Sequence, residues 1–421
     1  MMIRFAPPEL RDRLIHARDV LANVCRGWEF FPLDGDFDPD DYDVEVTEGT
    51  EIRITLNEAL EAVDGTVSEV LWWADCLEKG RLVDRGTVVV PGQTIFYVTP
   101  ISEEACGIAY HGYPCALSDL GVVAALNVGG IECSVTLVQE FTAFSLFAEK
   151  ELECDNKVYP SYGERDIFAV VSHKGELEPG RARALCASYL FQLATCHDLV
   201  FGFAGFPSSE LGDYADFPTT DEGDIGLPLT IRPLDVSTGM PELHDLYLEG
   251  ATSNNLQWSF VSFVKAVEYV SMTVIKRTAH NEIRARLTAQ EALRPHAAYI
   301  EGLIELVQQQ REYGKQREYI RRTIQECCDL PRVAQLLPAY LGGPGRIAAQ
   351  EREQKAVVED LCDAIIATRN YLVHAKAAYE SSGKECPDTE LREFLDCVKA
   401  IAFQAITWYQ NLPEHARVAE D

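Results

Sequence analysis

Hydrophobic residues recur with two different periods along the 421-residue chain, and the change falls near residue 250. Before it, apolar residues alternate over short stretches, as in residues 131–137, which is typical of strands. From residue 255 they recur every three or four positions, which is typical of helices packed on a core. The pattern predicts an α+β fold with two domains: a strand-rich N-terminal region, residues 1–250, and an all-α bundle, residues 251–421.

The N-terminal region is rich in residues that end secondary-structure elements, with 22 of the 28 glycines and 14 of the 20 prolines. Strands are predicted at 44–46 and 52–56 around Glu48-Gly49, at 88–90 and 95–98 around Pro91-Gly92, and at 122–126 and 131–137 around Gly129-Gly130. Helices are predicted at 9–24 and 181–199. The Pro- and Gly-rich stretch 206–241 is predicted to be a long loop or linker.

The C-terminal region shows four long helical patterns. They cover residues 256–274, 300–324, 357–372 and 391–408, and Gly314 is a possible break in the second. Prolines and a glycine-rich stretch, residues 341–345, fall between the patterns and predict the connections. These four helices predict a bundle of roughly 170 residues.

The formal charge of −30 is distributed unevenly. Residues 1–250 carry 16 Lys and Arg against 44 Asp and Glu, whereas residues 251–421 carry 21 against 23. Residues 276–322 hold ten basic and six acidic residues, a local net charge of +4. Because nucleic acid attracts basic surfaces, any contact with RNA is expected in the bundle.

The sequence predicts a cytoplasmic protein without a membrane segment, a metal or a cofactor. No uninterrupted apolar run reaches the roughly 18 residues that span a bilayer, and the first residues lack an apolar signal core. The 13 cysteines include no Cys-x-x-Cys pair, and no nucleotide-binding or serine-hydrolase motif occurs. The acidic stretch 34–41 resembles a calcium loop in spacing, but Pro39 replaces the required glycine, which favours an exposed acidic loop.

Candidate chemistry lies in the third helix of the bundle, in the run Arg369-Asn370-Tyr371-Leu372-Val373-His374. His moves a proton near neutral pH, and the planar guanidinium of Arg grips phosphate oxygens in pairs. Asn can orient a hydroxyl group. These three residue types together are suited to cutting RNA without a metal, by attack of its own 2′-hydroxyl on the neighbouring phosphorus.

The helical geometry favours two copies of this site. Asn370 and His374 are four residues apart and share a face, whereas Arg369 lies about 140° around the helix from His374. The reaction also needs one group to accept a proton and another to donate one, which two histidines from two chains can do. We therefore expect a homodimer or a higher even oligomer in which facing helices share the site.

The segment Ala367–His374 resembles the signature of the HEPN superfamily: an Arg, a polar residue that is often Asn, a few residues, then a His. Residues 260–269 are similar to the first long helix of HEPN domains in ApeA-type anti-phage proteins, which also carry a strand-rich N-terminal region. The resemblance covers residues 251–412. It implies a dimeric, metal-independent endoribonuclease for single-stranded RNA in antiviral defence, with a phage-derived trigger. Arg369 and His374 are then catalytic and Asn370 supports them.

Glu268 lies among apolar residues of the first bundle helix and could pair with Arg369 to fix its orientation. A partly exposed Glu that pairs with another nearby cation explains this residue equally well. Two other classes of function also stay open. One is a catalytically inactive HEPN-like module that dimerises or binds a nucleotide or partner, and the other is a small-molecule-binding protein with a structural helical tail.

Overall fold

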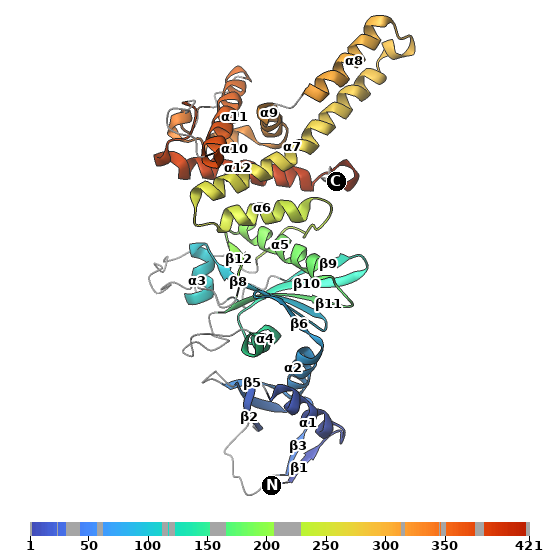
Figure 1. Ribbon diagram of the computed structural model, residues 1–421, viewed down its shortest axis with the longest axis vertical. Helices are drawn as coiled ribbons and strands as arrows, with labels where there is room; N and C mark the ends of the chain where they lie inside the picture. The colour runs from blue at the N-terminus through green and yellow to red at the C-terminus, as the bar shows by residue number, and fades with distance from the viewer. Residues whose placement is uncertain are drawn as a thin grey trace. The chain divides into compact units, whose positions relative to one another are not determined.

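The structure is a computed structural model of the chain. It describes residues 2–22, 24–30, 43–56, 62–111, 117, 123–151, 166–205, 229–312, 316–344, 346, 351–374 and 383–417. The acidic stretch 34–41, residues 206–228 of the predicted loop and Gly314 lie outside these ranges. The chain forms two compact units, Met1–Leu234 and Asp235–Asp421 (Figure 1).

The α+β class predicted from the sequence is confirmed: a strand-rich N-terminal unit precedes a mostly helical C-terminal unit. Composition placed the change at residue 250, whereas the compact units divide after Leu234. The difference arises from helix α6 (Met240–Thr252), which belongs to the second unit and packs on α7 (Leu256–Leu287). The sequence pattern did not predict this helix, because Gly239 and Pro241 at its start are residue types typical of loops.

The main sheet of the first unit is antiparallel. Within the described ranges its seven strands are β6 (Arg81–Asp84), β7 (Thr87–Val90), β8 (Gln93–Pro100), β9 (Ala124–Val128), β10 (Ile131–Val138), β11 (Ile167–His173) and β12 (Phe201–Phe203). Two hairpins predicted from the sequence, β7–β8 and β9–β10, are confirmed. Gly129 and Gly130 both have positive φ, 60° and 90°, which is the backbone that tight hairpin turns need.

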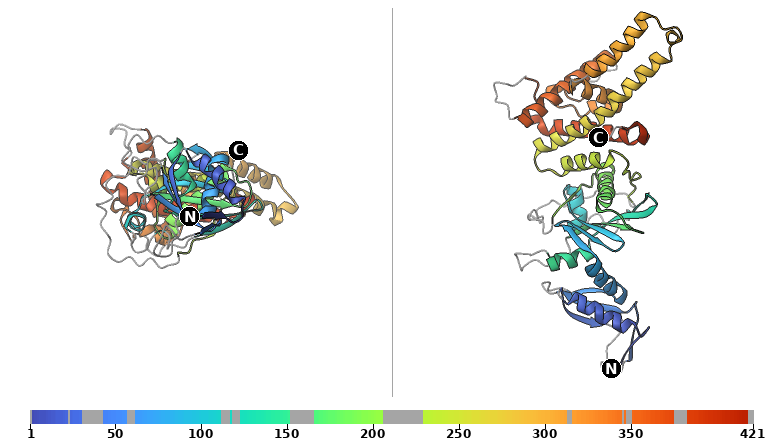
Figure 2. Two further views of the ribbon diagram at one scale, coloured as in Figure 1. Left: turned by 90° about the horizontal axis from the view of Figure 1, so that it is seen from below. Right: turned by 45° about the vertical axis from the view of Figure 1, so that its right-hand side comes forward.

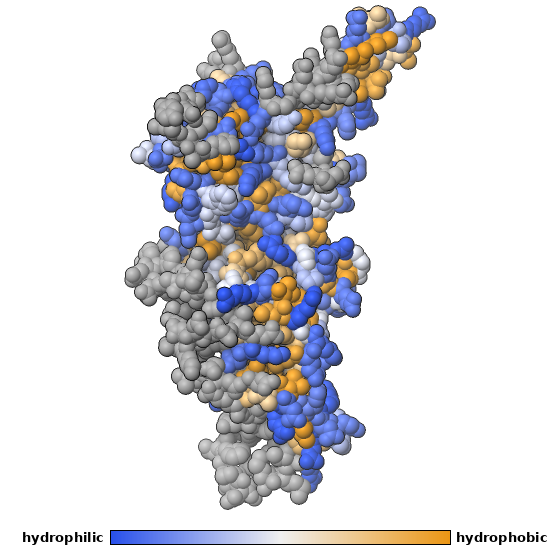
Figure 3. Space-filling model, in the orientation of Figure 1, coloured by the Kyte–Doolittle hydropathy of each residue, from blue (hydrophilic) through white to orange (hydrophobic). Residues whose placement is uncertain are grey.

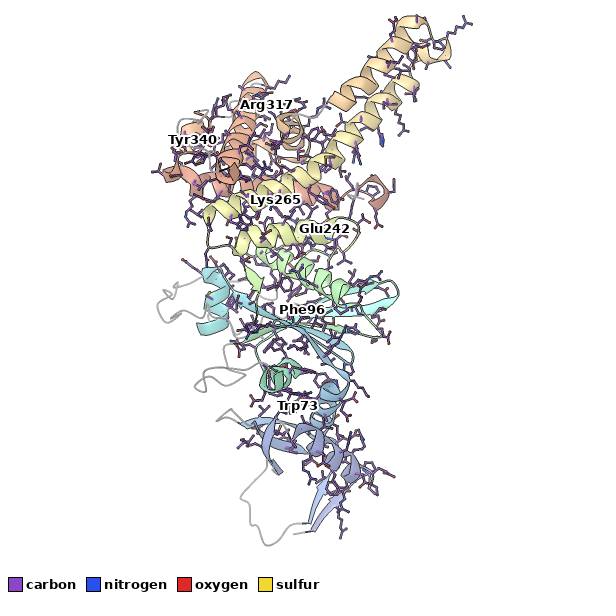
Figure 4. The ribbon with its side chains drawn as sticks, in the orientation of Figure 1. Trp73, Phe96, Glu242, Lys265, Arg317 and Tyr340 are labelled. Atoms are coloured by element: carbon purple, nitrogen blue, oxygen red, sulfur yellow. The ribbon has the colours of Figure 1, made fainter. Side chains whose placement is uncertain are left out.

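Helices cover both faces of this sheet (Figure 1). Helix α5 (Pro179–Cys196) packs on β8, β10, β11 and β12, and α4 (Ala143–Glu151) packs on β7 and β8 from the other side. Successive side chains of β8 point to opposite faces of the sheet, which lets the strand pack against a helix on each side. Tyr97 stacks on Phe144 of α4, while the neighbouring Phe96 (Figure 4) contacts Phe203. Helix α3 (Glu103–His111) follows β8.

The first residues of the unit form two smaller sheets. Strand β1 (Met2–Phe5) pairs in parallel with β3 (Asp43–Val46), while β2 (Cys25–Phe30), β4 (Glu51–Leu56) and β5 (Ala62–Thr66) form an antiparallel sheet. The strands predicted on either side of Glu48-Gly49 are therefore present but belong to different sheets. Apolar alternation identifies a strand but leaves its partner open.

Helices α1 (Leu10–Leu21) and α2 (Val67–Lys79) complete this part of the unit. Helix α1 confirms the first predicted helix. Helix α2 was not predicted, although Thr66 and Glu69 form a capping box that marks its start: the Thr66 hydroxyl accepts from the Glu69 amide, and the Glu69 carboxylate accepts from the Thr66 amide. Trp73 of α2 lies in the main core cluster of the unit (Figure 4).

The second unit is a helical bundle built on α7. Its other helices are α6, α8 (Ala297–Glu312), α9 (Gln316–Cys327), α10 (Leu330–Ala334), α11 (Glu351–His374) and α12 (Leu391–Gln410), with short 3₁₀ turns at Gln290–Leu293, Ala339–Leu341, Asp388–Glu390 and Glu414–Ala416. Three predicted helices are confirmed as α7, α11 and α12. The pattern at 300–324 is covered by two helices, α8, which ends at Glu312, and α9, which begins at Gln316; the suspected break at Gly314 lies outside the described residues.

Helix α7 is the central core helix of this unit. Asn255 caps it by accepting hydrogen bonds from the amides of Gln257 and Trp258, at 2.9 and 3.3 Å. It contacts α6, α9, α11 and α12, and its Phe260 packs on Phe394 of α12 with ring centroids 5.2 Å apart. By length and composition α7 could cross a membrane, but 72% of its apolar window is buried inside the structure; since core helices pass the same test, this is weak evidence for a membrane.

A histidine is buried in α6. His244 has no exposed surface, and burial lowers the pKa of its imidazole to about 3. The nearby Asp235 carboxylate acts in the opposite direction but does not offset burial. The ring is therefore neutral at physiological pH.

Candidate active site

The motif helix α11 is anchored in the bundle by one apolar face. Its buried positions recur every three or four residues, as the sequence pattern predicted: Val357, Val358, Leu361, Cys362, Ala364, Ile365 and Thr368. This face packs on α9 and α7. Arg369 and Asn370 follow it on a partly buried part of the helix, and Val373 is 46% exposed.

His374 is the last residue of α11. Its backbone continues the helix, so it follows Asn370 by one turn on the same face. Its side chain lies outside what the structure describes.

Arg369 is held by neighbours on two sides. Its Nη2 lies 3.8 Å from Oε2 of Glu268, and its Nη1 donates to Oδ1 of Asn370 at 3.2 Å. The side chains of Arg369 and Glu268 are 24% and 25% exposed. The Nε of Arg369 is buried and has no hydrogen-bond acceptor among the described residues. A guanidinium has five N–H donors, so Arg369 is oriented yet keeps donors for an anion.

Glu268 connects α7 to a third helix. Its Oε1 accepts a hydrogen bond from Nε2 of Gln316, the first residue of α9. Glu268, Gln316, Arg369 and Asn370 therefore form one polar cluster from α7, α9 and α11. The structure brings together Glu268 and Arg369, the pair suggested by the sequence. Gln316 was missed because it belongs to a run of polar residues that no sequence signal distinguishes.

Ion pairs fix α9 against α11 beside this cluster. Arg317 (Figure 4) pairs with Asp363 and lies 2.5 Å from Glu359. Lys384 lies 2.5 Å from Asp363. Hydrogen bonds from Arg317 and then Lys384 lower the pKa of the Asp363 carboxyl below its usual range. Ion pairs thus connect α9 to α11 in the part of the bundle that holds Gln316 and Arg369.

The positive charge of this part of the bundle is partly neutralised. Arg321 and Arg322 both pair with Glu318, and their hydrogen bonds lower the pKa of its carboxyl to about 2. With Arg317, three of the basic residues whose side chains the structure describes in 276–322 are therefore engaged by carboxylates. The net charge of +4 counted from the sequence does not show which cations are paired, because the count treats every charge as equally free.

A cavity of about 550 Å³ lies elsewhere in the second unit, at the start of α6. Glu242 (Figure 4) and Glu414 are among its lining residues, together with Tyr269, Ser237 and Thr238. Two carboxylates disfavour a phosphate ligand there. Within the described ranges, no three His, Cys, Asp or Glu side chains converge as a metal site.

Comparisons of the chain with protein-family models, with curated proteins and with solved structures found no match. The site must therefore be interpreted from its own geometry. That geometry is an arginine with unused donors, held by a carboxylate and an amide, on the helix that ends in a histidine. The guanidinium of Arg369 can bind a phosphate group, and the same helix ends in a residue type that carries protons.

Proposed function

We propose that this protein is a metal-independent endoribonuclease of HEPN type that cuts single-stranded RNA at a site shared by two copies of the chain. The observation that carries the proposal is that the guanidinium of Arg369 contacts Glu268 and Asn370, five residues before His374 ends the same helix. Arg369 and His374 are the catalytic residues in this proposal. Asn370 supports them, and Glu268 positions Arg369.

The reaction divides two proton transfers between two chains. One His374 takes the proton of the RNA 2′-hydroxyl, whose oxygen then bonds to the adjacent phosphorus. The other His374 gives a proton to the departing 5′-oxygen, and Arg369 neutralises the added negative charge on the phosphoryl oxygens. The products are a 2′,3′-cyclic phosphate and a 5′-hydroxyl end. No metal or cofactor takes part.

A homodimer, or a higher even oligomer, is part of the proposal. Val373 lies next to His374 on α11 and is 46% exposed, so its side chain is accessible to a second surface. Facing copies of α11 would cover it. They would also bring the two faces that carry Arg369 and His374 into one groove.

The proposed setting is cytoplasmic antiviral defence by abortive infection, in which a phage-derived trigger releases the nuclease and no membrane takes part. A nuclease of this kind must be restrained in a healthy cell. Residues 1–250 carry a net charge of −28 and repel RNA. This charge is one means of restraint.

The alternative is a catalytically inactive HEPN-like module that dimerises or binds a nucleotide or partner protein. The pairing of Arg369 with Glu268 supports it, because a guanidinium beside a carboxylate also suits a structural role. The two proposals differ in what removal of His374 does.

Substitutions in the motif test the proposal with purified full-length protein and a single-stranded RNA oligonucleotide. His374→Ala should abolish cleavage, and Arg369→Lys should reduce it severely because an ammonium lacks the planar fork. Asn370→Ala should be milder. His415→Ala, at an exposed histidine of the same unit, is the matched control and should cut like the unmodified protein. Full activity of His374→Ala would contradict the site assignment.

A further inference from the structure

The C-terminal half of α7 extends beyond the bundle core as one side of a helical arm. Helix α8 runs back beside it (Figures 1 and 2), and the hydroxyl of Tyr299 donates to the carbonyl oxygen of Arg286 at 2.8 Å. The space-filling view shows hydrophilic and hydrophobic residues mixed over this arm (Figure 3). On α7, the residues Met272, Lys276, His280 and Arg284 are all exposed.

These four residues form a continuous stripe that begins at the candidate site. They follow Glu268, the partner of Arg369, at intervals of four residues, which is about 6 Å per step along the helix. Each step turns the position by about 40°, so the stripe winds round α7: Lys276 lies about 80° and Arg284 about 160° around the axis from Glu268. Lys276, the first cation, therefore lies roughly 12 Å along the axis from Glu268, and Arg284 roughly 24 Å.

The cations of the stripe differ from those of α9. Among the described residues, neither Lys276 nor Arg284 has a carboxylate within ion-pair distance, and the same holds for Arg286 and Arg294 near the end of the arm. By contrast, Arg317 and its neighbours on α9 are paired with acids. Residues 276–312, the two sides of the arm, hold six Lys and Arg against five Asp and Glu in a chain of net charge −30, and the unpaired cations named above lie on α7 and the turn after it. Among the described side chains, cations without a carboxylate partner thus gather on α7 and the turn that follows it.

We propose that Lys276, His280 and Arg284, exposed on α7, bind successive phosphates of a single-stranded RNA that winds round this helix towards Arg369. This inference rests on the proposed function in taking RNA as the substrate, but it concerns binding and not cleavage. Lys276 and Arg284, with the polar ring of His280 between them, recur every 6 Å along α7, which suits the regular spacing of phosphates on a flexible strand.

A protein partner fits this stripe less well. The cores of protein–protein interfaces are depleted of lysine, whose flexible, strongly hydrated ammonium is costly to immobilise. Phosphate contacts need no such burial, because the ammonium stays hydrated and displaces counterions from the strand. An acidic surface of a second copy of the chain is the competing occupant, and the test separates it from RNA.

The test measures binding in a His374→Ala background, so that cleavage cannot interfere. The ligand is a fluorescein-labelled 20-nucleotide oligouridine, and anisotropy gives the dissociation constant from 50 to 300 mM NaCl. Lys276→Gln with Arg284→Gln should weaken binding about tenfold or more at 100 mM salt. The slope of log K against log salt should become shallower by about 1.4, because each phosphate contact on a single strand contributes about 0.7.

The matched control is Arg332→Gln with Arg392→Gln. Both arginines are exposed in the same unit, lie outside α7 and have no carboxylate partner within ion-pair distance among the described residues. This pair should change the dissociation constant less than twofold, which would show that position matters and not net charge alone.

Three results would overturn the inference: no binding of the oligouridine by the His374→Ala parent at 50 mM salt, equal losses for both double variants, or no loss for the α7 pair. A loss of dimer in sedimentation without a change in RNA binding would instead assign the stripe to a protein partner. If the α7 pair shows the predicted slope change while the unmodified protein cuts no RNA, the path stands and the nuclease proposal fails.

Discussion

Acidification should destabilise the chain through His244 of α6. Its pKa in the folded protein is about 3, because the ring is fully buried, against about 6.5 for an unperturbed histidine. Below pH 6.5 the unfolded chain binds a proton that the folded chain excludes. The free energy of unfolding therefore falls as the pH drops from 6.5 towards 3, and the full contribution of the neutral ring is present only above that interval.

The size of the effect follows from the two pKa values. Between pH 8 and pH 5.5 the proton bound by the unfolded state should lower the free energy of unfolding by about 1.4 kcal/mol, and by about 2 kcal/mol at pH 5. Carboxyl groups contribute little above pH 5, because their ordinary pKa values lie near 4. The pKa values of Asp363 and Glu318 are lowered further still.

Urea unfolding of the full-length protein, followed by circular dichroism at pH 8, 6.5 and 5.5, measures this change. His244→Gln cannot titrate, so its free energy of unfolding should depend less on pH by about 1.4 kcal/mol across the interval. Any constant cost of the substitution cancels in the comparison between pH values. Equal pH dependence in the unmodified protein and in His244→Gln would refute the argument that this ring is buried neutral.

Three substitutions test other parts of the second unit. Glu268→Gln should lower RNA cleavage about 10- to 100-fold by loosening Arg369, while urea unfolding changes by about 1 kcal/mol or less; unchanged cleavage would remove the positioning role. Gly239→Ala should destabilise by about 2–4 kcal/mol in thermal unfolding, because φ is +80° and the new Cβ would lie 2.3 Å from the Tyr409 hydroxyl; a cost below about 0.5 kcal/mol would contradict this. Asp363→Asn should lower the free energy of unfolding by about 1 kcal/mol at pH 7, and this loss should vanish as acid protonates the Asp363 carboxyl below its usual pKa of about 3.9. A loss of stability that persists at pH 2 would refute the ion-pair explanation.

The sequence was most informative where the amphipathic period was long. Helices α7, α11 and α12 each present several turns of apolar residues, so their positions were predictable. Helix α6 was missed because Gly239 and Pro241 at its start resembled a loop, although a proline in the first turn also begins helices. Helix α2 was missed although Thr66 and Glu69 carry a capping signal.

The candidate site was predictable only in part. The position of Glu268 among apolar residues suggested a pairing with Arg369, and in the structure its carboxylate lies within ion-pair distance of that guanidinium. The contribution of Gln316 depends on how α9 packs against α7, which a polar run in the sequence does not encode. Partners across a bundle are set by tertiary packing, whereas local periodicity sets only which face of each helix is buried.

The central claim is that Arg369 and His374 cut RNA by internal attack without a metal. The most direct measurement incubates the full-length protein with a single-stranded RNA in excess EDTA and identifies the new ends by mass spectrometry. The account predicts cleavage that survives EDTA, with 2′,3′-cyclic phosphate and 5′-hydroxyl ends, and no cleavage by His374→Ala. A requirement for added divalent metal, or products with 3′-hydroxyl and 5′-phosphate ends, would contradict it.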